Sequence, residues 1–113
     1  MTKLEAEQLL ADSRKKIDEI DLQLRELLNR RTQIVVDVLR AKDHLQLPVY
    51  EASREEAVLK KITDGNPGPL DDASFRRLFG TLMQVMREFQ VARREHETPH
   101  APQSEDPTSE TFE

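Results

Sequence analysis

Residues 4–43, LEAEQLLADSRKKIDEIDLQLRELLNRRTQIVVDVLRAKD, decide the fold of this 113-residue chain. The stretch contains no Pro and no Gly and consists mainly of strong helix formers, so it predicts one very long helix. Its apolar residues recur in a heptad-like rhythm and form two rows, which are Ile17, Leu24 and Val38, and Ile20, Leu27, Ile34 and Ala41. These rows predict a helix that buries one face against other helices.

A second, shorter helix is predicted at residues 53–64. Pro48 separates it from the first helix, because a proline disfavours helical backbone in the residue before it. Ser53 and Glu56 have the spacing of a capping box, in which two side chains satisfy backbone N–H groups at the start of a helix. We therefore expect the helix to begin with Ser53 as its N-cap.

A third helix is predicted from Asp71 or Asp72 to about residue 94. The run GNPGP at residues 65–69 is a strong turn signal, and an aspartate suits the N-cap that follows it. The apolar stripe of this helix comprises Phe75, Leu78, Phe79, Leu82, Val85, Met86 and Phe89. The sequence thus predicts an all-α fold with three helices per chain.

We expect one helical domain at residues 1–95 and a tail at residues 96–113. The tail is acidic, contains several prolines and has too little apolar material to order itself, so we expect it to be disordered.

The length of the first helix predicts the quaternary structure. A helix of about 40 residues is roughly 60 Å long, about twice the diameter of a compact domain of this size. Two shorter helices of the same chain cannot cover it, so its apolar face must pack against a second copy. Two-fold homodimers are the commonest such assembly, and we expect an intertwined helical homodimer.

Composition excludes several classes of function. The net charge of -5 argues against duplex nucleic acid as a partner, and the absence of Cys excludes disulfides and thiol nucleophiles. The three histidines lack the spacing of a zinc site, so we expect no metal. The sequence begins without the apolar core of a signal peptide and contains no run long enough to span a membrane. We expect a cytoplasmic protein without a membrane partner.

Two cations interrupt the apolar face of the long helix. Arg31 occupies the row of Ile17 and Leu24, and Lys42 lies about three turns further on, close to the same face. Buried cations are costly unless they meet anions, either in a structural ion pair or in a bound ligand.

Arg14 lies about 25 Å from Arg31 along the helix and cannot share a small site with it within one chain. In an antiparallel dimer, however, Arg14 could reach the site of the partner subunit. Considered without a dimer, Arg14 is interpreted as a solvated surface charge.

The two shorter helices each place one polar residue on their apolar face. Glu55 precedes Val58 and Leu59 by three and four residues, and Gln90 follows Met86 by four. Such groups can be satisfied core residues, but cations, a carboxylate and an amide together suit a small polyanionic ligand with a hydroxyl group. No residue pattern supports covalent, phosphoryl-transfer or glycosidase chemistry.

Several motifs together resemble the all-α, type II chorismate mutase family. They occur in order over about residues 9–92 and are RKKIDEID at 14–21, LLNRR at 27–31, RAK at 40–42, PVYEASRE at 48–55, NPGP at 66–69, and the helix from Leu78 to Gln90. The resemblance implies a homodimer that converts chorismate to prephenate by a [3,3] shift without a cofactor. It also implies that Arg31 and the partner's Arg14 hold the two substrate carboxylates.

The same resemblance assigns the remaining roles. Lys42 and Gln90 would donate hydrogen bonds to the ether oxygen, Glu55 would accept one from the ring hydroxyl, and Arg54 and Glu51 would line the site.

Two residues depart from the family pattern. Glu51 stands where the family more often has Asp. Met86 replaces a small or hydroxyl residue that faces a substrate carboxylate, and it either points into the pocket or turns into the core.

Two other functions stay open at the level of sequence. One is an isochorismate-pyruvate lyase of the same fold, which uses similar cations. The other is a weakly active regulatory subunit that docks on an upstream shikimate-pathway enzyme.

Overall fold

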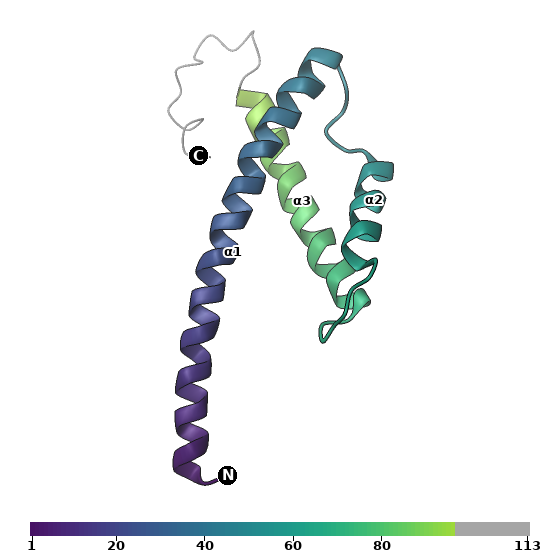
Figure 1. The fold of residues 1–113 in the computed structure, drawn as a ribbon. Helices are drawn as coiled ribbons and strands as arrows, with labels where there is room; N and C mark the ends of the chain where they lie inside the picture. Colours follow the sequence, from purple (N-terminus) through teal and green to yellow (C-terminus); the bar gives the residue numbers. More distant parts are fainter. Residues whose placement is uncertain (97–113) are drawn as a thin grey trace. The chain divides into compact units, whose positions relative to one another are not determined.

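The computed structural model describes residues 1–96 and contains three helices, α1 (Lys3–Leu45), α2 (Ala52–Thr63) and α3 (Asp72–His96) (Figure 1). The predicted all-α class and the three helices are confirmed, and each predicted end is correct to within two residues. The tail predicted at residues 96–113 lies, from residue 97 on, outside the described residues. The chain divides into two units, Met1–Ile34 and Val35–Glu113.

The first unit is the N-terminal part of α1. Thr2 and Glu5 form a capping box: the Thr2 N–H donates to Glu5 Oε1 at 2.8 Å, and the Glu5 N–H donates to Thr2 Oγ1 at 3.1 Å. This box was not among the features predicted from the sequence, although Thr-x-x-Glu is its usual signature. The apolar rows of this unit, Ile17, Ile20, Leu24 and Leu27, are each more than half exposed in the single chain.

The C-terminal end of α1 is a Schellman motif. The Leu47 N–H donates to the Lys42 carbonyl at 2.8 Å and the Gln46 N–H donates to the Asp43 carbonyl at 3.2 Å. Gln46 adopts the left-handed conformation, with φ of 58°, at the position that glycine usually occupies. The helix therefore ends at Leu45, three residues before the predicted break at Pro48.

We predict that Gln46→Gly stabilises the protein. The left-handed conformation costs a residue with a side chain about 1–2 kcal/mol, and glycine removes this cost. About 0.4–1 kcal/mol of the gain in stability is offset, because glycine gives the unfolded chain more conformational entropy. We expect the melting temperature to rise by about 3–6 °C in calorimetry. Gln46→Ala is the control, because it keeps the backbone strain and removes most of the side chain. Its melting temperature should not rise above that of the wild type. A lower melting temperature for the glycine variant would contradict the assignment.

The predicted capping box of α2 is wrong. The helix begins at Ala52, its N-cap is Glu51, and no side chain caps it. Ser53 therefore lies inside the first turn, where its hydroxyl cannot replace a cap. Glu56, the other half of the predicted box, instead accepts a hydrogen bond from Arg76 Nη2 of α3 at 2.9 Å.

The turn after α2 and the start of α3 follow the sequence prediction. Gly65 and Gly68 both have positive φ, which glycine adopts without strain. Asp71 is the N-cap of α3, and its Oδ1 accepts from the Ser74 N–H at 3.0 Å. Hydrogen bonds from the Ser74 side chain and backbone lower the pKa of Asp71.

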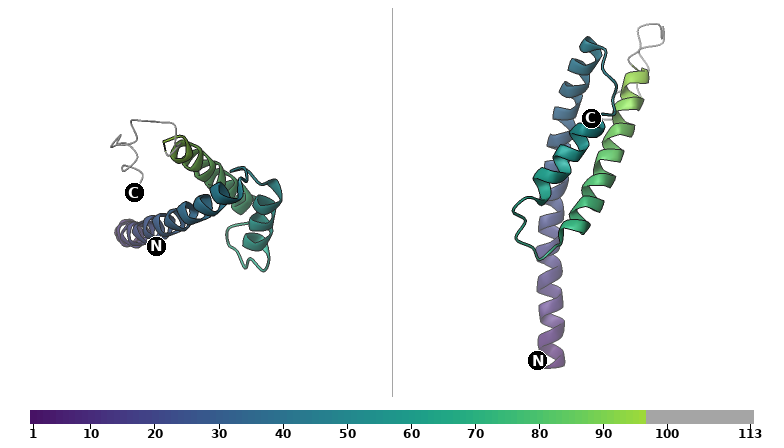
Figure 2. Two further views of the ribbon diagram at one scale, coloured as in Figure 1. Left: turned by 90° about the horizontal axis from the view of Figure 1, so that it is seen from above. Right: turned by 90° about the vertical axis from the view of Figure 1, so that its right-hand side faces the viewer.

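In the second unit, α2 packs along α3, and the two helices run side by side in both views of Figure 2. The buried residues of this unit are Leu39, Met83, Met86 and Gln90. Met83 was absent from the predicted stripe, whereas Leu78 and Val85, which belonged to it, are exposed. The described contacts thus cover only one side of the apolar surface of α3. None of the described helices is long and apolar enough to cross a membrane.

Candidate functional site

Lys42 lies in the last turn of α1, and its side chain reaches the connection between α1 and α2, residues 46–51. Its side chain is only 12% exposed, its Nζ donates to the Val49 carbonyl at 2.8 Å, and it pairs with Glu51 Oε1 at 3.2 Å. An ammonium group has three N–H donors. These two contacts therefore leave one donor for a ligand.

Arg94 fixes the same connection from the side of α3. Its Nε donates to Asp43 Oδ1 at 2.7 Å, and its Nη2 donates to the Leu47 carbonyl at 3.1 Å. Asp43 lies in the last turn of α1, just before the connection, and Leu47 lies within the connection. Arg94 and the Schellman motif together hold the backbone of this connection.

Glu55 of α2 is paired with Arg87 of α3. Arg87 Nη1 contacts both carboxylate oxygens, at 2.5 and 2.6 Å, and the hydrogen bond to Glu55 raises the pKa of Arg87. The guanidinium carbon also lies 5.0 Å from the centre of the Tyr50 ring, in a cation–π arrangement. These contacts hold the Glu55 carboxylate and the Arg87 side chain in one geometry.

Gln90 of α3 is a buried amide, 7% exposed. Its Nε2 donates to the Met86 carbonyl at 3.1 Å, while its Oε1 is buried without a hydrogen-bond partner among the described residues. A buried polar atom without a partner costs about 1–3 kcal/mol. The amide therefore keeps one N–H and one oxygen for a bound group, and Met86 is itself buried.

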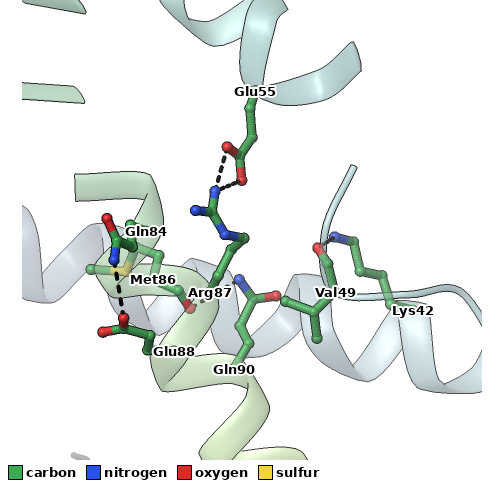
Figure 3. Close-up of polar contacts among 8 residues, drawn as sticks. All are labelled: Lys42, Val49, Glu55, Gln84, Met86, Arg87, Glu88 and Gln90. Carbon is green, nitrogen blue, oxygen red and sulfur yellow. Dashed lines mark hydrogen bonds and ion pairs between the residues drawn. The ribbon is translucent and has the colours of Figure 1, made fainter. Parts of the chain in front are cut away.

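Three segments bring these groups together in the second unit. Lys42 comes from the end of α1, Glu55 from α2, and Arg87 and Gln90 from α3 (Figure 3). Among residues 1–96, no group of three His, Cys, Asp or Glu side chains is arranged to hold a metal ion. The assembled groups offer hydrogen-bond donors and one paired carboxylate, which is suited to binding an oxygen-rich anion.

The other predicted site residues lie as follows. Glu51 is half-buried and bound to Lys42, so one structural ion pair exists at this position. Arg54 is exposed in the first turn of α2. In the first unit Arg14 is exposed and Arg31 is half-buried, and the unbroken helix between them separates the two by about 25 Å. One chain's Arg14 and Arg31 therefore cannot meet at one small ligand.

Arg87 and Arg94 were not among the residues predicted from the sequence. Arg87 lies four residues after Met83 and three before Gln90, so helical spacing places it beside the buried face of α3. A cation in that position is a signal of the same kind as Arg31 and Lys42. Its partner could not be read from the sequence, because Glu55 is 32 positions away.

Comparison with known proteins places this arrangement in a family. Residues 13–91 match the family model described as chorismate mutase type II. The chain is 42% identical over 77 residues to the bifunctional chorismate mutase/prephenate dehydratase of Neisseria gonorrhoeae, covering 68% of this chain and 21% of that protein. It is 38% identical over 53 residues to a chorismate mutase of Methanocaldococcus jannaschii, covering 47% of this chain and 54% of that one. The chain thus spans about a fifth of the length of its bifunctional relative.

Solved structures agree with the family match. Form II of the chorismate mutase of Thermus thermophilus superposes with a TM-score of 0.70 and 30% identity, covering 73% of this chain and 93% of that one. Form I gives a TM-score of 0.65 and 32% identity, covering 68% and 96%. With three helices in the same order as its sequence motifs require, and with a family match over most of its length, the chain belongs to the type II chorismate mutase family.

Proposed function

We propose that this chain converts chorismate to prephenate, with Lys42 and Gln90 as the groups that act on the reacting ether oxygen. The observation that carries the proposal is that each of these half-buried or buried side chains keeps one N–H donor after its own contacts are counted. The bifunctional relatives support the assigned product, because they join a chorismate mutase to a prephenate dehydratase.

The chemistry fits groups that donate hydrogen bonds and exchange no protons. A [3,3] shift breaks a C–O bond and forms a C–C bond within one molecule, so it needs no acid, base or nucleophile. Negative charge develops on the ether oxygen as the C–O bond breaks. The Lys42 ammonium and the Gln90 amide stabilise that charge, and positioning of the enolpyruvyl arm lowers the entropic part of the barrier.

Glu55 accepts the hydrogen bond of the ring hydroxyl in this proposal. Each of its oxygens contacts Arg87 and retains a further lone pair for the substrate. Arg54, exposed on the first turn of α2, lines the site and helps to orient the carboxylates. Glu51 lines it through its ion pair with Lys42, which fixes the ammonium.

Arg31 and the partner subunit's Arg14 bind the two substrate carboxylates in a homodimer. The exposed apolar rows of residues 1–34 support this assembly, because an apolar helix face of this length is stabilised by packing on a second copy. The 25 Å or so that separates the two arginines along one helix supports the contribution of Arg14 across subunits.

The test is a direct assay with the purified 113-residue chain. We expect chorismate absorbance to fall faster than in a buffer blank and chromatography to identify prephenate as the product. A parallel assay with isochorismate measures pyruvate release. Pyruvate from isochorismate without prephenate from chorismate would favour the lyase, and no turnover of either compound would favour a regulatory subunit.

A further inference from the structure

The Arg87–Glu55 ion pair joins two residues of different standing. The proposed function assigns the substrate's ring hydroxyl to Glu55 and assigns no role to Arg87. Arg87 lies outside the set of residues that the family resemblance implies for the site. It nevertheless makes the shortest contacts to Glu55, through one nitrogen that bridges both carboxylate oxygens. The two side chains are 30% and 22% exposed, so water competes with this pair less than with a fully exposed one.

We propose that Arg87 is a positioning residue for the substrate: it holds the Glu55 carboxylate in the orientation that accepts the ring hydroxyl. This inference rests on the proposed function. A glutamate has three side-chain torsions, and the bridging guanidinium restricts them before the substrate arrives. Tyr50, whose ring lies against the guanidinium, restricts Arg87 in turn. Preorganisation of this kind strengthens binding because less freedom is lost when the ligand binds.

A second ion pair between the same two helices provides a comparison. Arg76 of α3 pairs with Glu56 of α2 at 2.9 Å, but these side chains are 44% and 64% exposed. Glu56 has no role in the proposed site. If ion pairs between α2 and α3 served only to hold the helices together, the two pairs would affect catalysis alike.

The experiment compares Arg87→Met with Arg76→Met in the 113-residue chain, by steady-state kinetics with chorismate. We expect Arg87→Met to raise KM about tenfold or more and to change kcat by less than about threefold. The hydroxyl lies outside the bonds that break and form, so its binding is lost equally from the ground and transition states. Arg76→Met should leave both constants within about twofold of the wild type.

Further variants separate positioning from stability. Arg87→Lys keeps a cation that can reach one carboxylate oxygen, so we expect its KM to lie between those of the wild type and Arg87→Met. If circular dichroism shows that Arg87→Met does not fold, Arg87→Lys takes its place in the test. In a Glu55→Gln background, Arg87→Met should change KM by less than about twofold, because the carboxylate it positions is gone.

The possible outcomes are distinct. An unchanged or lowered KM for a folded Arg87→Met protein, or equal effects of Arg87→Met and Arg76→Met, would overturn the inference while the mutase function stands. The same KM effect in the presence and absence of Glu55 would also overturn it. A wild-type chain that does not convert chorismate would overturn the proposed function itself, and the role of Arg87 with it.

Discussion

We expect Lys42→Ala to lower kcat for chorismate by at least about a hundredfold while the protein stays folded. Removal of one preorganised donor from an oxyanion-type site costs about 10²–10³ in kcat. Lys42 is the only charged donor that the proposal places at the ether oxygen. The measurement is steady-state kinetics beside circular dichroism and a thermal melt.

A structural effect of Lys42 must be separated from a catalytic one, because its ammonium also holds the Val49 carbonyl and Glu51. Arg94→Met is the matched control. It removes the other side chain that holds this connection, at the Leu47 carbonyl, without removing a donor from the proposed site. We expect Arg94→Met to lose some stability and to keep kcat within about threefold. Equal losses of kcat in the two variants would make Lys42 a structural residue.

We expect mixed dimers of Arg14→Ala and Lys42→Ala to recover activity that neither variant has alone. Each homodimer has the same defect in both sites, and loss of an arginine that binds a carboxylate should reduce kcat/KM by about a hundredfold. In a heterodimer, one site combines Lys42 from one subunit with Arg14 from the other and is intact. Random exchange at equal concentrations should restore about a quarter of the wild-type activity.

The control for the mixing experiment is Arg31→Ala with Lys42→Ala. These two residues belong to the same subunit's site in the proposal, so every site of their heterodimer retains a defect. We expect no recovery from this pair. Recovery from the Arg31 pair, or none from the Arg14 pair after exchange is verified by mass spectrometry, would contradict the contribution of Arg14 across subunits.

Local signals determined where the helices lie. The uninterrupted run before Pro48 and the glycines and prolines at residues 65–69 set the bounds of α1, α2 and α3, because backbone preferences depend on neighbours in the sequence. The same reasoning failed for the N-cap of α2. The spacing of Ser53 and Glu56 fits a capping box, but Glu56 pairs with Arg76 on another helix, a contact that the local pattern does not contain.

The sequence by itself determined the three helices and, through its motifs, the family, and it singled out Lys42, Glu55 and Gln90 as candidate site residues. Only the tertiary structure decided what each of these groups contacts. Glu55 meets Arg87, and Lys42 meets Val49 and Glu51, because the packing of α2 on α3 and the path of the connection bring distant residues together. Periodicity places a side chain on a face of its own helix, but the partner on the facing helix depends on how the two helices are rotated and shifted against each other.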